Sequence, residues 1–305
     1  KVLFDHISDA AHAQNLRFLF LGDKAQLPPV GESESIVWNE VHAKKADLRE
    51  IVRYGGPILE LVTKIRTAAE QFVPTLTLPR PEKSPQLTLD WEGVERLSAV
   101  DFIHSLQHYA KQGVFSKPNM AKAITWTNAR TTVLNKVIRE AIFDNVSSPW
   151  VETDRVVFTA PAKDVDKEPA ASTDDEGTVM SVRETYHPLY SEFKIYSLSI
   201  VLDTGLPVTA YILHPEAEAA FVRKSAGLAD EARSMPKRWK AFWEFKDSFH
   251  SVKHAYALTT HRSQGSTFVH AFVDTFDILK NQNRKEGFQC LYVACSRAKT
   301  RLTLM

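Results

Sequence analysis

The sequence predicts an α/β protein in which alternating strands and helices are interrupted by a smaller β-rich insert. Apolar strand-like runs alternate with helical patterns before residue 148 and after residue 250, which is typical of a sheet covered by helices. Between these parts, short runs of β-branched and aromatic residues are separated by turn residues and predict a small β module. These runs occupy residues 154–160, 177–184, 193–203 and 207–213.

The composition is that of an ordinary globular protein with room for two or three domains in 305 residues. The net charge of +1 means that any contact with nucleic acid would need a local basic surface. Cys290 and Cys295 form no CxxC pair, which favours reduced core residues and a cytoplasmic location. No apolar run reaches membrane-spanning length and no signal-peptide pattern is present at the N-terminus, so no membrane partner is expected.

In the first half of the chain, residues 1–17 predict a helix and 18–22 a buried strand. A second helix is expected over 48–70, with Gly55-Gly56-Pro57 as an internal break or a fresh start. Residues 74–96 contain four prolines and predict an extended connector.

The pattern then predicts a helix over 99–112, a buried strand ending in a polar turn over 121–128, and a helix over 129–143. Residues 164–176 are rich in acids and are expected to form a solvated loop. The basic and aromatic stretch 216–249 is expected to be helical, and strand–helix–strand alternation returns from 255 to the C-terminus.

Three polar stretches next to apolar runs carry a family resemblance. They are Phe18-Leu19-Phe20-Leu21-Gly22-Asp23-Lys24-Ala25-Gln26-Leu27-Pro28-Pro29-Val30, Ala257-Leu258-Thr259-Thr260-His261-Arg262-Ser263-Gln264-Gly265-Ser266-Thr267-Phe268 and Cys290-Leu291-Tyr292-Val293-Ala294-Cys295-Ser296-Arg297-Ala298-Lys299. In this order they resemble the third, fifth and sixth motifs of superfamily 1 DNA helicases. The first two look most like the branch of RecD, Pif1 and Dda.

The resemblance implies a RecA-like parallel-sheet domain in residues 48–148 and 250–305. Residues 1–47 would then be a remnant of a first RecA-like domain, and 149–249 an SH3-like, β-rich and then helical insert. The sequence contains no GxxxxGK[ST] phosphate cradle, and Asp5 does not take the place of the family's magnesium-binding Asp-Glu pair. The chain is therefore expected to begin after the second motif, and the ligand of Mg²⁺ is expected outside it.

The resemblance also implies an ATP site. Gln26 resembles the glutamine that senses the γ-phosphate, and Asp23 is expected to shape its turn. Arg53 and Arg297 resemble the arginines of the fourth and sixth motifs, whose forked guanidinium groups suit phosphate oxygens. Their alternative role is an interdomain salt bridge. Gln264 and Gly265 are expected to line the nucleotide side of the same cleft.

Single-stranded DNA is the implied second partner. Thr127 and Asn128 resemble the family's TN turn, and four residues of the fifth motif resemble its backbone-gripping face. These four are Thr259, Thr260, His261 and Ser263. No cysteine or carboxylate set completes a zinc site around the histidines, so no metal is expected there.

The stretch 233–246 interleaves basic and aromatic residues and allows two interpretations. It could form a stacking and phosphate-binding surface, or an amphipathic helix that buries Trp239, Phe242, Trp243 and Phe245. The helical spacing favours burial. Trp126 is likewise expected in the core.

The sequence is thus interpreted as the C-terminal portion of an ATP-dependent DNA helicase that moves along single-stranded DNA, 5′ to 3′ by resemblance. Other replication or recombination proteins are further expected partners, and DNA replication and DNA repair are the expected processes. The alternative is a truncated or split subunit that binds DNA or a partner without hydrolysing ATP. A helicase-related nuclease component is a weaker alternative, because no carboxylate-lysine constellation is visible.

Overall fold

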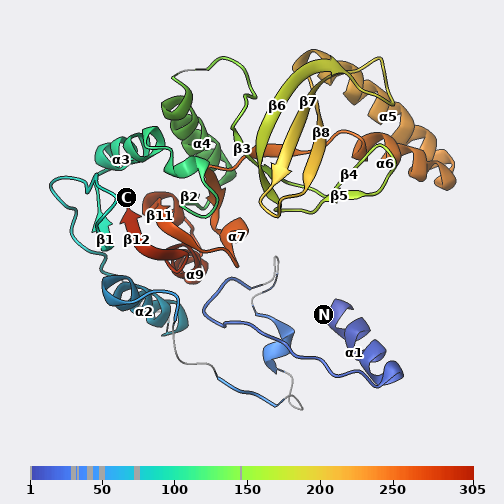
Figure 1. Cartoon of the computed structure of the whole chain (residues 1–305). Coiled ribbons are helices and arrows are strands. Elements are labelled where there is room, and N and C mark those ends of the chain that lie inside the picture. The colour runs from blue at the N-terminus through green and yellow to red at the C-terminus, as the bar shows by residue number, and fades with distance from the viewer. Residues whose placement is uncertain are drawn as a thin grey trace. The chain divides into compact units, whose positions relative to one another are not determined.

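The computed structural model describes residues 2–28, 32, 34–39, 44–47, 52–71, 76–144 and 146–305 (Figure 1). The chain forms two compact units. The first contains residues 1–102, 123–130 and 259–305, and the second contains 103–122 and 131–258.

The described α-helices are α1 Val2–Gln14, α2 Gly56–Gln71, α3 Ala99–Lys111, α4 Asn128–Phe143, α5 Glu218–Ser234, α6 Trp239–Asp247, α7 Thr260–Ser263, α8 Thr275–Ile278 and α9 Arg284–Cys295. The strands are β1 Gly93–Arg96, β2 Ala121–Thr125, β3 Arg155–Phe158, β4 Ala162–Lys163, β5 Pro169–Ala171, β6 Glu176–Tyr186, β7 Lys194–Leu202, β8 Pro207–Leu213, β9 Val252–His254, β10 Ala257–Thr259, β11 Phe268–Val273 and β12 Ala298–Leu304. Short 3-10 turns occupy Ile36–Asn39, Val114–Ser116, Pro215–Ala217 and Pro236–Arg238.

A parallel five-stranded sheet has the order β1-β12-β11-β2-β10, with β12 parallel to both β1 and β11. Helix α9 is buried along the whole run from Gly287 to Cys295, and it packs against α2 (Figure 1). Continuous burial without a polar face is expected for an element covered on all sides. The α/β class predicted from the alternating pattern is therefore observed.

Helix α2 makes a fresh start rather than continuing an earlier helix. Gly56 begins it with a positive φ of 52°, a conformation that favours glycine, and Pro57 follows in the first turn, where its missing N–H costs nothing. The predicted helix over 48–70 is wrong before this point, since residues 52–55 are not helical. Residues 48–51 lie outside the described part of the chain.

The predicted buried strand over 18–22 is wrong. Residues 16–23 have no regular secondary structure, and none of the described strands pairs with them. A strand exists through hydrogen bonds to a neighbour, and the apolar side chains here have no sheet to cover. Leu19 and Leu21 are more than four-fifths exposed as a result.

The expected connector over 74–96 has no regular helix or strand from 76 to 92. Its last residues instead form β1, which pairs in parallel with β12 from Gly93 against Arg301 to Arg96 against Leu304. The sequence analysis missed this strand because four residues are too few for a clear alternating pattern.

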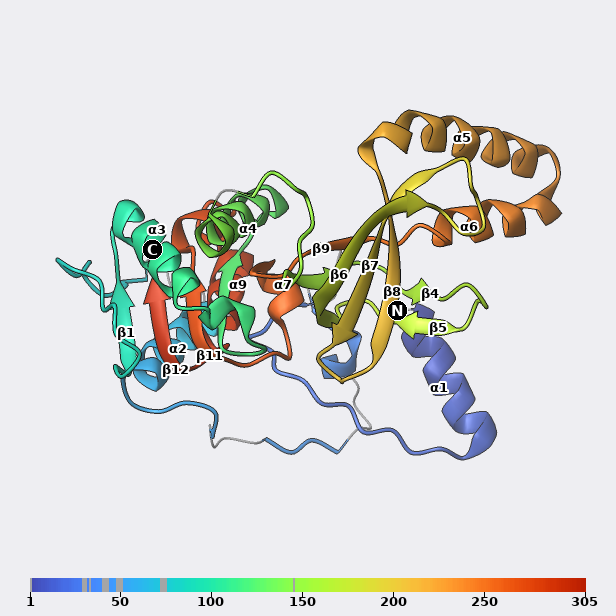
Figure 2. The ribbon, with the colours of Figure 1, turned by 45° about the horizontal axis from the view of Figure 1, so that its top comes forward.

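The second unit is built on an antiparallel sheet with the order β8-β7-β6-β3-β9 (Figure 2). All four predicted β runs are present in it. Inward-facing apolar residues of β3, β6, β7 and β8 form its core, as expected for strands that are buried on one face. Residues 216–249 are largely helical, as predicted, and their helices α5 and α6 pack against each other beside this sheet.

The acidic stretch 164–176 is only partly a solvated loop. Asp164, Asp166 and Glu168 are exposed, and the short pair of strands β4 and β5 flanks them. Glu176 is half-buried and belongs to a network of charges, where it accepts from Lys122 Nζ at 2.8 Å and Arg155 Nη2 at 3.2 Å. A buried cation needs such a partner, so this carboxylate stays with the core.

A substitution of Gly177 would test how closely strands β6 and β7 pack in the antiparallel sheet. A Cβ at this position would lie 2.7 Å from both Ile200 Cγ2 and the Val201 carbonyl oxygen. Gly177→Ala should therefore lower the free energy of unfolding by about 1–3 kcal/mol through overpacking. Gly227→Ala, in the interior of α5 with no atom within 4 Å, should raise it by roughly 0.5–1 kcal/mol. Urea unfolding curves would measure both, and equal effects of the two changes would contradict the packing described.

Candidate functional site

The turn of residues 22–26 is held to helices α2 and α9 by one carboxylate. Asp23 Oδ1 accepts the N–H of Ala25 at 3.0 Å, which shapes the turn as predicted. Asp23 Oδ2 accepts the Tyr292 hydroxyl of α9 at 2.8 Å, and Arg66 Nη2 of α2 lies 3.2 Å from Oδ1. These bonds place residues 23–26 against two helices of the same unit.

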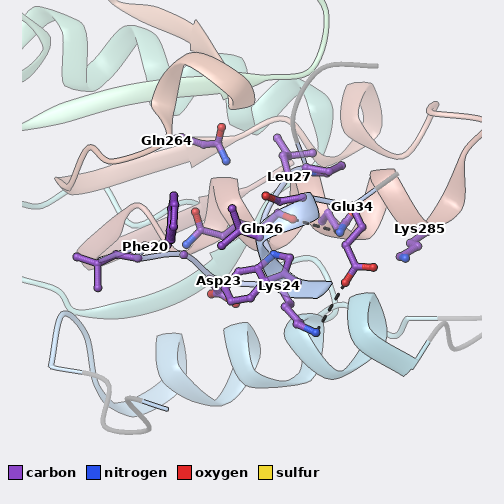
Figure 3. Close-up of a pocket in the computed structure, with 15 residues that line it drawn as sticks. Phe20, Asp23, Lys24, Gln26, Leu27, Glu34, Gln264 and Lys285 are labelled. Carbon is purple, nitrogen blue, oxygen red and sulfur yellow. Dashed lines mark hydrogen bonds and ion pairs between the residues drawn. The ribbon is translucent and has the colours of Figure 1, made fainter. Parts of the chain in front are cut away.

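A polar cavity of about 410 Å³ opens beside this turn (Figure 3). Gln26 lines it from the turn, and Gln264 lines it from the segment after α7 (Figure 3). Gln289 of α9 donates its side-chain amide to the Gln26 carbonyl oxygen at 3.1 Å and fixes the backbone there. The structure thus brings together Gln26 and Gln264, which are far apart in the sequence, and leaves both side chains facing open space. Gly265 is exposed and has a positive φ of 82°, so the chain after α7 turns in a way that favours glycine.

Two arginines meet at the C-terminal end of α9. Arg53 Nη1 donates to the Ser296 carbonyl oxygen at 3.0 Å, and Arg297 Nη2 donates to the Ser296 hydroxyl at 2.7 Å. Arg297 is 2% exposed. Its Nε–H group donates to the Val293 carbonyl oxygen, and its Nη1–H group donates to the Ser266 carbonyl oxygen. Among the described residues, no carboxylate forms an ion pair with either guanidinium.

The electrostatics of this arginine pair are unfavourable in the absence of an anion. Burial, together with the neighbouring charge of Arg53, lowers the pKa of the Arg297 guanidinium to about 10. Burial is also the main cause of the raised pKa of the nearby Tyr54, whose phenol stays neutral. An anion placed between the two arginines would relieve their repulsion. The interdomain salt bridge that the sequence analysis weighed for them is not present among the described residues.

Gln289, Tyr292 and Ser296 connect these two parts of the site. They lie three and four residues apart, so they share one face of α9 and its C-terminal end. Gln289 and Tyr292 hold the turn that carries Gln26, while Ser296 gathers Arg53 and Arg297. One helix face therefore positions Gln26, Arg53 and Arg297, three of the five residues for which a role at ATP is predicted.

The donors of the predicted TN turn already bind an internal carboxylate. Asp277 Oδ2 accepts the backbone N–H groups of Trp126 and Thr127 at 2.9 and 2.8 Å, and its Oδ1 accepts the Thr127 hydroxyl at 3.0 Å. A hydroxyl has one hydrogen, so the Thr127 side chain has none left for a phosphate. Asn128 is exposed as the first residue of α4. Trp126 packs against the hydrophobic core of the first unit, as predicted.

Most of the predicted DNA-binding residues of the fifth motif are buried, and one is exposed. The hydroxyl of Thr260 donates to the Thr125 carbonyl oxygen at 3.0 Å and that of Ser263 to the Thr260 carbonyl oxygen at 2.8 Å. Both side chains are fully buried, and Thr259 is 9% exposed. His261 is exposed. Of the four predicted DNA-binding side chains in this motif, His261 is thus the accessible one, while Thr260 and Ser263 use their hydrogens within the fold.

The sequence analysis missed Asp277, Tyr292 and Arg66 as residues that position the site. Tyr292 lay inside a stretch that was identified, but only the structure shows its hydroxyl directed at Asp23. The one available signal for Asp277 was its place just after an apolar strand, where polar groups often gather at a sheet edge.

No group of three or more potential metal ligands occurs within the part of the chain that the structure describes. Among the same residues, no helix is long and apolar enough to cross a membrane. Cys290 and Cys295 are both buried free thiols, as the absence of a CxxC pair suggested.

Comparison with known proteins gives one family match. Residues 254–305, which contain the fifth and sixth motifs, match the family of UvrD-like helicase C-terminal domains. The resemblance to superfamily 1 helicases is thus confirmed over this segment.

A relative with a curated sequence is an uncharacterized protein, R530, of Acanthamoeba polyphaga mimivirus. It is 21% identical over 364 aligned residues, which cover 99% of this chain and 72% of the relative.

Among solved structures, the chain is similar to the Pif1 helicase from Bacteroides in complex with ADP-AlF3 and single-stranded DNA, with a TM-score of 0.45, 13% identity and 92% of this chain covered. The Pif1 helicase of Candida albicans gives a TM-score of 0.43 and 15% identity over 93% of this chain. The chain spans 60% and 63% of the length of these two proteins.

The Asp277 carboxylate should be important for stability because it is buried and accepts hydrogen bonds from three donor groups of Trp126 and Thr127. Asp277→Ala should lower the free energy of unfolding by about 2–3 kcal/mol, the scale of losing hydrogen bonds to a charged group. Asp230→Ala, which removes an exposed ion pair with Arg233 on α5, should change it by less than about 0.5 kcal/mol. Urea unfolding would compare the two variants, and a near-neutral Asp277→Ala would mean that Trp126 and Thr127 have other acceptors.

Proposed function

We propose that this chain is the C-terminal portion of an ATP-dependent superfamily 1 DNA helicase of the RecD, Pif1 and Dda branch. In this proposal ATP and Mg²⁺ bind between two RecA-like domains, and the protein moves 5′ to 3′ on single-stranded DNA. The β-rich second unit corresponds to the SH3-like insert of that branch. The proposal rests on the family match over 254–305 together with the convergence of Arg53 and Arg297 on Ser296.

The arginine pair supports a site for the terminal phosphate of a nucleotide. Two guanidinium groups without a carboxylate partner among the described residues repel each other, and a phosphate supplies the missing negative charge with oxygens that match their forked geometry. Arg53 is only partly buried and reaches the pair from outside α9. It is the guanidinium that can move onto a phosphate while Arg297 stays fixed by its carbonyl partners.

Gln26 supports the same site from the neighbouring turn. Its amide can donate to a γ-phosphate oxygen or orient the attacking water without adding charge. Its backbone is held by Gln289 and its turn by Asp23, so the side chain projects from a rigid base. Gln264, on another side of the same cavity, is a second neutral donor for the nucleotide.

In this proposal, DNA is bound by the exposed side chains of two polar turns, at residues 127–128 and 259–263. His261 and Asn128 have exposed side chains and offer hydrogen bonds to a phosphate backbone without reading the bases. Thr127, Thr260 and Ser263 would instead set the shape of these turns. In this proposal, His261 and Asn128 are therefore the side chains of these two turns that contact the DNA strand.

The 305-residue chain alone should hydrolyse ATP no faster than background, because its sequence has no phosphate cradle. DNA-stimulated turnover by this purified chain would contradict the assignment. A cradle lysine and an Asp-Glu pair encoded upstream in the same gene would favour the helicase over a non-hydrolysing subunit. Their absence from the gene and its neighbours would favour the subunit.

In a protein that joins this chain to a phosphate cradle, Arg297→Lys should lower DNA-stimulated ATP hydrolysis by about 10³-fold, the scale of losing an arginine finger. Arg301→Lys is the matched control, because Arg301 is also a buried arginine, 5% exposed, but donates to the Leu89 carbonyl oxygen away from the pair. It should retain hydrolysis within about threefold of the parent. Equal losses in both variants, with equal losses of stability, would show that Arg297 acts only in the fold.

A further inference from the structure

Helix α6 and the turn before it expose two tryptophans that the sequence analysis expected to be buried. Phe242 and Phe245 are 9% and 1% exposed, as an amphipathic helix predicts, whereas Trp239 and Trp243 are 37% and 50% exposed. All six tryptophans lie in the described residues, and these two are the ones among the large exposed hydrophobic side chains. The prediction that all four aromatics are buried is therefore wrong for this pair.

The two tryptophans present a defined aromatic surface. They lie one helical turn apart, so they share a face of α6. Phe242 packs edge-on between them, with ring centroids 5.3 Å from Trp239 and 5.0 Å from Trp243. A buried ring that fixes both exposed rings limits the freedom that they would lose on binding a ligand.

Positive charge surrounds this aromatic surface. Lys246 Nζ lies 5.7 Å from the centroids of both the Phe242 and the Trp243 rings, and Lys237 and Lys240 are exposed next to Trp239. Among the described residues, no carboxylate forms an ion pair with any of these three lysines, and the nearby carboxylates of Glu244 and Glu231 pair with Lys167 and Arg238 instead.

The neighbouring acids are mostly neutralised by other cations. Glu244 Oε1 lies 3.0 Å from Lys167 Nζ of the β4–β5 loop, and Glu231 of α5 pairs with Arg238. The bond from Lys167 lowers the pKa of the Glu244 carboxyl and keeps it ionised in that pair. Asp247 is the remaining acid on α6, so the surface as a whole is cationic.

We propose that α6 and the turn of residues 236–238 bind single-stranded DNA, with bases stacked on Trp239 and Trp243 and phosphates held by Lys237, Lys240 and Lys246. The choice of DNA rests on the proposed function. A single strand fits because its bases expose the π faces that tryptophan stacks on, whereas in a duplex these faces are covered by neighbouring pairs. The charge of the surface complements a phosphate backbone.

The test is fluorescence anisotropy of a labelled mixed-sequence single strand with the 305-residue chain. Trp239→Ala with Trp243→Ala should weaken binding at least tenfold, since stacking on an aromatic side chain contributes strongly for each base. Trp239→Phe with Trp243→Phe should remain within about threefold, because a phenyl ring still stacks. Met180→Ala with Val222→Ala, two exposed apolar residues elsewhere in the second unit, is the matched control and should change nothing.

Two further arms separate stacking from charge. An abasic strand of the same length should bind the parent as weakly as the normal strand binds the double alanine variant. Lys237→Gln, Lys240→Gln and Lys246→Gln together should reduce the slope of log affinity against log salt by about 2, since each cation contributes about 0.7 for single strands. Displacement of the strand by polyglutamate of equal charge at equal concentration would point to an acidic protein segment as the occupant and overturn the proposal.

The outcomes also distinguish this inference from the proposed function. Unchanged affinity in the double alanine variant, with an unchanged circular dichroism spectrum, would overturn the α6 surface and leave the helicase assignment intact. A loss of affinity that is equal for normal and abasic strands would show that the tryptophans act only on the fold, and would overturn it as well. A parent chain that binds no single strand at all would contradict both.

Discussion

The C-terminal end of α9 is the constraint on which the candidate site depends. The Ser296 carbonyl and hydroxyl oxygens accept from Arg53 and Arg297, whose charges repel each other, and the partial negative charge of a helix C-terminus favours both. This arrangement is held without a carboxylate partner among the described residues. A carboxylate would neutralise the pair permanently, whereas backbone and hydroxyl oxygens fix its geometry and leave its charge available to a ligand.

Two carboxylates of the first unit, those of Asp23 and Asp277, fix the shape of polar turns by accepting hydrogen bonds from groups within the protein. Asp23 joins the turn of Gln26 to Tyr292 and Arg66, and Asp277 takes the donors of Trp126 and Thr127. Both turns are thus rigid before any ligand arrives, which lowers the cost of ordering them on binding. The same bonds remove Thr127 from the set of direct phosphate donors.

The sequence was informative where apolar periodicity and motif spacing agreed. The helices of 99–143, the strands of the β module and the α9–β12 segment all follow from their patterns, because burial alone decides those elements. The strand expected over 18–22 is not formed, because a strand also needs a neighbouring strand to pair with. The local pattern of apolar residues does not show whether such a neighbour is present. The prediction that Trp239 and Trp243 are buried was wrong for a related reason. Helical spacing shows which residues share a face of a helix, but it does not show whether another element covers that face. For the candidate site, the motifs predicted Gln26, Arg53, Gln264, Gly265 and Arg297, whereas the hydrogen-bond partners that position Gln26, Arg53 and Arg297 are visible only in the structure.

The most direct test of the account compares affinities for ATP and ADP, because Arg53 is assigned to the terminal phosphate alone. The measurement uses the protein that joins this chain to a phosphate cradle, and its Arg53→Gln variant, in which the amide can still donate to Ser296. The account predicts that the variant loses at least tenfold in affinity for ATP and keeps its affinity for ADP. Equal losses for the two nucleotides, or no loss for either, would contradict the assignment of the arginine pair to a phosphate site.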